Sequence, residues 1–208
     1  MNTKLLLPAV IGGLLVNVAS AATVWNPAGN GHGPAPATAP FGDAANWTNG
    51  VPDAIDKAVF NVPGAADATV SGAISDFQLV QGDGNDGGTI QVLGGGSIST
   101  FSADWSAVGY NNDAHLIVDA GGSFSFGHHA WIGFLPGATG IVDISGTVNV
   151  ALMFGLGWSG GDGLVNVFDG GALNLQQIHG DGATSIKQNS LLSWLKRWDI
   201  AIEWQMCF

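Results

Sequence analysis

The stretch Gly95-Gly96-Ser97-Ile98 is the clearest indication of the fold, because close variants of it recur along the chain at nearly constant intervals. These variants share a glycine in their second position, and they are Ser71-Gly72-Ala73-Ile74, Gly121-Gly122-Ser123-Phe124, Ser145-Gly146-Thr147-Val148 and Gly170-Gly171-Ala172-Leu173. Successive copies are 24, 26, 24 and 25 residues apart. A second landmark, an aliphatic residue followed by glycine, recurs every 24 residues at Val108-Gly109, Ile132-Gly133 and Leu156-Gly157. Two landmarks with one period indicate a repeat architecture.

Each period also contains short runs in which apolar and polar residues alternate, as at Ile90 and Val92 or at Leu116 and Val118. Alternation bounded by glycine, asparagine and aspartate is typical of β-strands. We therefore predict an all-β fold: a parallel, right-handed β-helix of about five coils with a period of 24 to 25 residues. Glycine is expected at the coil corners because sharp turns need backbone angles that other residues avoid. A β-sandwich or a propeller is the alternative.

The first residues predict export. Lys4 supplies a positive charge, residues 5–16 are apolar, and Ala19-Ser20-Ala21 is a small-residue cleavage site. These features are typical of a secretory signal peptide over residues 1–21, which predicts a secreted or outer-surface protein. A membrane anchor is the alternative, although the apolar run is short for a bilayer. After cleavage we expect no stable membrane insertion.

The charge of the mature chain is strongly one-sided. Between residues 22 and 186 there are fourteen aspartates, no glutamate and one basic residue, Lys57. Such a surface repels nucleic acid and anionic lipid, so nucleic-acid binding is excluded as a function. The only cysteine is Cys207, so we expect no disulfide framework to stabilise the repeats. The abundance of apolar residues distinguishes this chain from a disordered acidic one.

Residues 22–66 precede the repeats of residues 67–186 and contain a different pattern: Trp25, then Asn46-Trp47, then Asp56-Lys57-Ala58-Val59-Phe60. In this pattern the chain resembles exported bacterial PEP-CTERM proteins and proteins with autotransporter-associated β-strand repeats, of planctomycete, verrucomicrobial and lentisphaeral type. The resemblance covers residues 24–186 and implies a C-terminal sorting segment or similar anchor, with no assigned activity. We interpret Trp25 and Trp47 as part of an N-terminal cap over the first coil. Sugar stacking by these tryptophans is the alternative.

Residues 187–208 do not continue the repeat, because glycine disappears and three tryptophans and three basic residues enter. The codons that must encode residues 198–205 read, when shifted by one base, as a Gly-Thr-Leu-x-Leu-Asn-Gly type of sequence. We hypothesise that this tail is out of frame, which makes the chain a truncated piece of a longer repeat protein. An amphipathic C-terminal cap helix is the alternative.

Two groups of residues are candidates for a functional site, one for catalysis and one for calcium binding. Asp119 and Asp143 each lie three residues before a motif glycine, so we expect them to stack in successive coils as a carboxylate pair. A solvated acidic ladder on the outer face is the alternative. Asp83, Asn85 and Asp86 lie in a Gly/Asp-rich stretch that resembles one calcium-binding turn, but no second copy follows, so a plain turn is the alternative. No further metal or cofactor is expected.

The histidines and the later tryptophans add no predicted site. His128 and His129 are adjacent and are expected to point to opposite faces of a strand, while His115 and His179 are interpreted as isolated. An exposed aromatic row would favour sugar binding, but Trp105, Trp131 and Trp158 are not in register from coil to coil.

A lyase of the β-helix type needs a lysine or arginine, and residues 67–186 contain neither. We therefore predict a structural or adhesive surface protein without catalytic activity. Carbohydrate binding or action on polysaccharide is the first alternative, and cation or ice binding is the second. The expected partners are extracellular polysaccharide or matrix, together with further copies of the chain through open coil ends.

Overall fold

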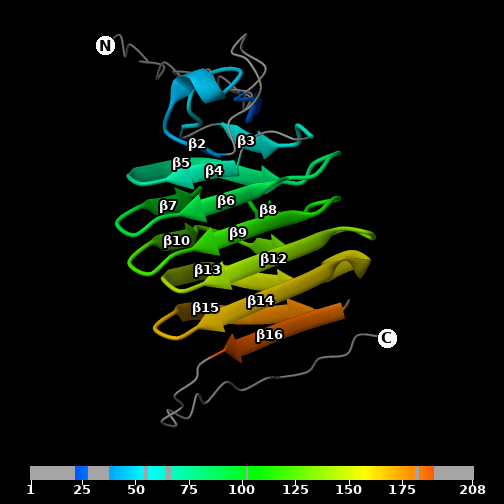
Figure 1. Ribbon diagram of the computed structural model, residues 1–208. Coiled ribbons are helices and arrows are strands. Elements are labelled where there is room, and N and C mark those ends of the chain that lie inside the picture. Colours follow the sequence, from blue (N-terminus) through cyan, green and yellow to red (C-terminus); the bar gives the residue numbers. More distant parts are fainter. Residues whose placement is uncertain are drawn as a thin grey trace, which may run out of the picture.

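The computed structural model describes residues 22–27, 38–53, 56–63, 67–101, 103–180 and 183–189. In these residues the chain is almost entirely β-structure, and its coils stack along one axis between the N-terminal and C-terminal ends (Figure 1). The strands pair in parallel from coil to coil. The predicted parallel β-helix is therefore confirmed. The predicted signal segment 1–21 and residues 190–208 of the tail lie outside the described residues.

Two hydrogen-bonded sheets form the walls of the solenoid. Sheet 1 has seven strands, and their order along the axis is β2 (Thr38–Pro40), β4 (Asp67–Val70), β6 (Thr89–Val92), β9 (Ala114–Val118), β12 (Thr139–Ile144), β14 (Asp162–Phe168) and β16 (Ala183–Asn189). The last strand, β16, begins within the predicted repeats and continues to Asn189, three residues into the segment where the repeat composition ends.

Sheet 2 has nine strands because some coils divide their second wall into two. Its strands are β1 (Ala22–Val24), β3 (Lys57–Phe60), β5 (Ala73–Gln81), β7 (Ser97–Thr100), β8 (Ser106–Val108), β10 (Ser123–Phe126), β11 (Ala130–Ile132), β13 (Thr147–Leu156) and β15 (Ala172–Gly180). Five complete coils begin at β4, β6, β9, β12 and β14. Each passes from sheet 1 through a tight turn into sheet 2, as the coil period predicts.

The register confirms both sequence landmarks. Phe124 lies opposite Ile98 on one side and Val148 on the other. Ile132 likewise lies between Val108 and Leu156. Like residues therefore stack on like in successive coils, as expected for a solenoid whose repeats contact only their neighbours.

The core lies between the two sheets and runs the length of the stack. From sheet 1 it receives a column of residues that are all 0% exposed, namely Ile90, Leu116, Val142 and Val165. Sheet 2 contributes Phe124, Phe154 and Ile132, also fully buried. The intervening residues of each strand face outward, so the alternation predicted from the sequence is confirmed.

The corner glycines have two different physical reasons, of which the sequence pattern indicates only one. Gly95 and Gly121, the first glycines of their pairs, have φ angles of 86° and 79°, which glycine adopts at low cost. The second glycines, such as Gly122, have no such φ angle. A Cβ atom at Gly122 would lie 2.7 Å from the carbonyl oxygen of Val92 in the preceding coil. At Gly96, Gly122, Gly146 and Gly171 the second position of the motif thus requires glycine because neighbouring coils approach too closely for any side chain, whereas Gly72 in the first complete coil has open space where a Cβ atom would lie.

Residues before the first complete coil close the N-terminal end of the core. Trp25 and Trp47 are 1% and 2% exposed, and their ring centroids lie 5.0 Å apart in an edge-on contact. Phe41 contacts both tryptophans and also Phe77 of the first complete coil, at 5.5 Å between centroids. A short helix, η1 (Ala44–Asn46), begins after Asp43, whose carboxylate accepts a hydrogen bond from the backbone N–H of Ala45. The burial of Trp25 and Trp47 leaves no ring face for a sugar, so that alternative is wrong.

Candidate functional site

A continuous series of aromatic side chains crosses the outer side of sheet 2, and we call it the aromatic ladder. In contact order its members are Trp105, Tyr110, Phe134, Trp131, Trp158 and His179. Successive ring centroids in this order lie 5.4, 5.5, 5.4, 5.2 and 5.9 Å apart. These separations are within the range at which aromatic rings attract one another. The ladder spans the coils that contain β8, β11, β13 and β15.

The ladder lies on the solvent side of the sheet. Trp131 is flanked in β11 by Ala130 and Ile132, both fully buried in the core, so strand alternation directs its ring outward. Trp131 itself is 8% exposed because its neighbours in the ladder cover it. The other aromatic members are half-buried, and His179 is exposed. The ladder is therefore distinct from the core between the sheets.

Glycines place most of these rings. Each of three ladder residues directly follows a glycine with positive φ, in the pairs Gly109-Tyr110, Gly133-Phe134 and Gly157-Trp158. Backbone hydrogen bonds hold these turns over one another, for example from the N–H of Phe134 to the carbonyl of Gly109 at 2.8 Å. Gly155, opposite Trp131 in the next coil, leaves space for the indole, because a Cβ atom there would overlap its six-membered ring.

The spacing of the tryptophans did not predict this ladder. Trp131 lies opposite Ala107 and Gly155, so the expectation that the tryptophans are out of register is confirmed. The tryptophans are nevertheless joined into one series, since Tyr110 and Phe134 lie between Trp105 and Trp131. The available signal was the residue after each glycine of the second landmark, which is aromatic at 110, 134 and 158.

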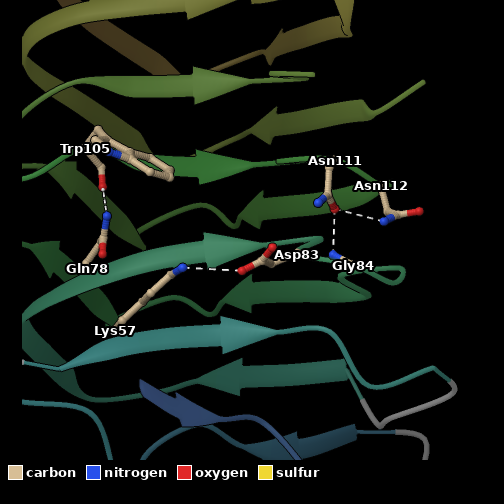
Figure 2. A network of polar contacts seen from close by, with 7 residues as sticks. All are labelled: Lys57, Gln78, Asp83, Gly84, Trp105, Asn111 and Asn112. Carbon is tan, nitrogen blue, oxygen red and sulfur yellow. Dashed lines mark hydrogen bonds and ion pairs between the residues drawn. The ribbon is translucent and has the colours of Figure 1, made fainter. Parts of the chain in front are cut away.

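Figure 2 shows Trp105, the first member of the ladder, together with polar contacts in its own coil and in the preceding coils. The ammonium group of Lys57 lies 3.3 Å from a carboxylate oxygen of Asp83, and both side chains are about one-third exposed, at 30% and 31%. Gln78 donates a 2.9 Å hydrogen bond from its side-chain amide to the carbonyl of Trp105. The side-chain oxygen of Asn111 accepts from the backbone N–H of Gly84 at 2.6 Å and from Asn112 at 2.9 Å.

The three calcium candidates have different partners. Asp83 pairs with Lys57, and the amide of Asn85 donates to the carbonyl of Asn61 at 2.9 Å. Asp86 lines a shallow hollow of about 280 Å³ together with residues of the following coils. Among the described residues, no three side chains of the types His, Cys, Asp and Glu gather closely enough to hold a metal ion.

Asp119 and Asp143 do not stack, and that expectation is wrong. The Cα of Asp143 lies opposite Ile117, whereas Asp119 lies beyond the end of β9 and accepts a hydrogen bond from the amide of Gln91 at 2.8 Å. The turn after β9 contains four residues, 119–122, but the turn after β12 contains two, 145–146. The position three residues before the motif glycine therefore lies in a turn for Asp119 and in a strand for Asp143.

Asp143 instead forms a cluster with residues that the sequence pattern does not connect. One of its carboxylate oxygens lies 2.8 Å from Nε2 of His115, and the other accepts from the amide of Asn166 at 2.7 Å. His115 also lines the hollow that contains Asp86 and Asp113. His115 is therefore not isolated. It lies opposite Ile141, two residues before Asp143, so the two side chains meet diagonally across neighbouring strands.

His128 and His129 also differ from the prediction. They lie in the turn after β10 rather than in a strand, and their ring centroids are only 4.1 Å apart, edge to face. Nδ1 of His128 is buried with no hydrogen-bond partner. Burial, and secondarily the charge of His128, lowers the pKa of His129 below its usual 6.5. Protonation of His129 is therefore disfavoured relative to an exposed imidazole.

Comparison with known proteins identifies no relative from which a role for these residues could be taken. No protein family, curated protein or solved structure matches the chain. Within the described ranges, no helix has the length and apolar character that crossing a membrane requires.

Proposed function

We propose that this protein is an exported structural or adhesive solenoid of the cell surface, without catalytic activity, whose contact surface is the aromatic ladder. The observation that carries the proposal is the ladder itself, an aromatic strip on the outer side of a hydrogen-bonded rod. Aromatic side chains dominate the energetics of binding surfaces because they bring a large area with little conformational entropy. A strip distributed over several coils suits attachment to an extended partner better than turnover of a small substrate.

Export is supported by the first 21 residues, in which Lys4, an apolar run and Ala19-Ser20-Ala21 form the pattern of a signal peptide. The pattern of Trp25 and Asn46-Trp47 further supports relation to exported PEP-CTERM and autotransporter-associated repeat proteins. The acidic composition supports an extracellular rather than a nucleic-acid partner.

Action on polysaccharide is the second candidate, and the cluster of His115, Asp143 and Asn166 is the observation that favours it. A histidine held by a carboxylate beside a hollow is an arrangement used in general acid–base catalysis. We place it second because the hollow is shallow and the cluster lies on sheet 1, on a different wall from the ladder.

The test is expression of the full chain in a Gram-negative host, followed by cell fractionation and mass measurement of the product. The proposal expects a chain that begins near Ala22 and lies outside the inner membrane. The purified product is then incubated with uncharged and acidic polysaccharides, and new reducing ends are measured. Retention in the cytoplasm contradicts export. Release of reducing ends that an Asp143→Asn variant abolishes contradicts the non-catalytic assignment.

A further inference from the structure

We infer that the aromatic ladder binds an uncharged polysaccharide chain laid along the solenoid axis. This inference rests on the proposed function and names the partner that the adhesive surface would take. The ladder is the starting point because it is built apart from the core, which has its own buried aromatic residues Phe77, Phe124, Phe126 and Phe154. The half-buried rings of the ladder form a contiguous aromatic strip at the surface, and apolar patches at a protein surface mark ligand-binding sites.

The shape of the ladder indicates a linear ligand. Its members belong to four successive coils, and neighbouring strands lie about 4.8 Å apart, so the strip runs roughly 14 Å along the axis. The ring planes of Trp105, Tyr110 and Phe134 lie within about 20° of one another, so these first three rings share one orientation, whereas the planes turn by 40° or more at each later step of the ladder. A small compact ligand would occupy one step of this strip, whereas an extended polymer can contact its half-buried members in several coils.

The charges near the ladder favour an uncharged ligand. Lys57 is the only basic residue between positions 22 and 186, and Asp83 already neutralises it. Asp104 lies next to Trp105 and accepts a hydrogen bond from its backbone N–H. A polyanion, whether nucleic acid or acidic polysaccharide, would meet carboxylates here without a free cation to offset them.

The chemistry of the ladder favours a sugar chain over a peptide. Extended peptides commonly bind by adding a strand to an open sheet edge. A peptide cannot add a strand in this way beneath the ladder, because β8, β11 and β13 each have a parallel partner on both sides. The surface offers half-buried aromatic rings instead.

Neutral amides lie at the same end of the strip. Asn111 directly follows the ladder residue Tyr110. Asn112 lies next to Asn111, and its side chain points away from the coil (Figure 2). Apolar rings with a few neutral hydrogen-bonding groups match a pyranose, which presents C–H faces and hydroxyl groups.

The experiment is a retention assay of the full mature chain on insoluble cellulose, chitin and xylan. Polygalacturonate serves as the acidic comparator and gelatin as the protein comparator. We expect retention by at least one uncharged polysaccharide, and a loss of roughly tenfold or more in affinity for Trp158→Ala and Tyr110→Ala. Phe168→Ala is the matched control, because Phe168 is an aromatic residue 36% exposed that lies outside the ladder, and it should bind as the parent does.

A conservative variant protects the test from misfolding. Trp158→Phe keeps a ring in the ladder, and it should retain most of the binding that Trp158→Ala loses. Absence of retention on all three uncharged polysaccharides overturns the inference, as does retention only by polygalacturonate or only by gelatin. Equal losses for Phe168→Ala and Trp158→Ala also overturn it. Export and the reducing-end assay are measured separately, so failure of glycan binding is distinguishable from failure of the proposed function.

Discussion

At the scale of single residues, glycine has two separate functions in adjacent positions of one motif. Gly95 has a φ angle of 86° and open space where a Cβ atom would lie. Gly96 has an ordinary φ angle, but a Cβ atom there would overlap the carbonyl oxygen of Val70. The first position therefore demands a backbone conformation, and the second demands the absence of a side chain.

The same substitution at the two positions tests this distinction. Asparagine enters the left-handed region more readily than other side chains, so Gly95→Asn should cost about 1 kcal/mol or less. Gly96→Asn forces two coils apart and should cost more than about 2 kcal/mol. Urea denaturation of both variants measures the difference. Equal losses of stability would contradict the assignment of steric exclusion to Gly96 alone.

At the scale of elements, the outer ladder depends on space provided by a strand of the next coil. Trp131 projects from β11 over Gly155 of β13, and its ring continues to Trp158 in the following turn. The contact explains why a glycine occupies the middle of a strand, where it would otherwise weaken the sheet.

We expect Gly155→Ala to displace the indole of Trp131 and to lower the free energy of unfolding by about 1–3 kcal/mol. Tryptophan fluorescence should change in the folded state, because the ring loses its place between Phe134 and Trp158. Gly72→Ala is the matched control, since no atom lies within 4 Å of the added Cβ and no positive φ is required. That control should be neutral or stabilising by about 0.4–1 kcal/mol. An unchanged fluorescence spectrum for Gly155→Ala would count against the packing described.

At the scale of the whole molecule, a stack of coils has ends that must be covered. The cluster of Trp25, Phe41, Trp47 and Phe60 covers the N-terminal end of the core, and the indole N–H of Trp47 donates to the carbonyl of Phe41 at 2.7 Å. Uncovered strand edges of a solenoid invite pairing with other chains.

Truncation of the cap should therefore affect both stability and association. We expect Trp47→Ala to lose about 3–5 kcal/mol and to self-associate with increasing protein concentration. Sedimentation velocity over a range of concentrations measures the association, alongside thermal melting. Phe101→Ala, which removes an aromatic ring that is 36% exposed, is the control and should remain close to the parent in both measurements. A monomeric, stable Trp47→Ala chain would show that these rings do not protect the end of the stack.

Local patterns in the sequence are sufficient to predict the coil and its two faces. The glycine motifs and the alternation of Ile90 and Val92 or Leu116 and Val118 are local patterns, so they predicted strands, corners and core without knowledge of distant contacts. The repeat then predicted which strands pair, because each coil can stack only on its neighbours. The buried columns of the structure follow that prediction.

Which outward-facing side chains contact one another depends instead on how neighbouring coils are aligned. The turn after β9 is two residues longer than the turn after β12, which brought Asp143 opposite Ile117 and near His115 rather than Asp119. A shift of two residues leaves every side chain on the same face, so the hydrophobic pattern gives no sign of it. The aromatic ladder could not be predicted from the sequence pattern for a related reason. Large rings such as that of Trp131 contact aromatic rings at positions that are not paired in the strand register. The spacing of residues along the chain predicts the register, but it does not predict contacts made by long side chains.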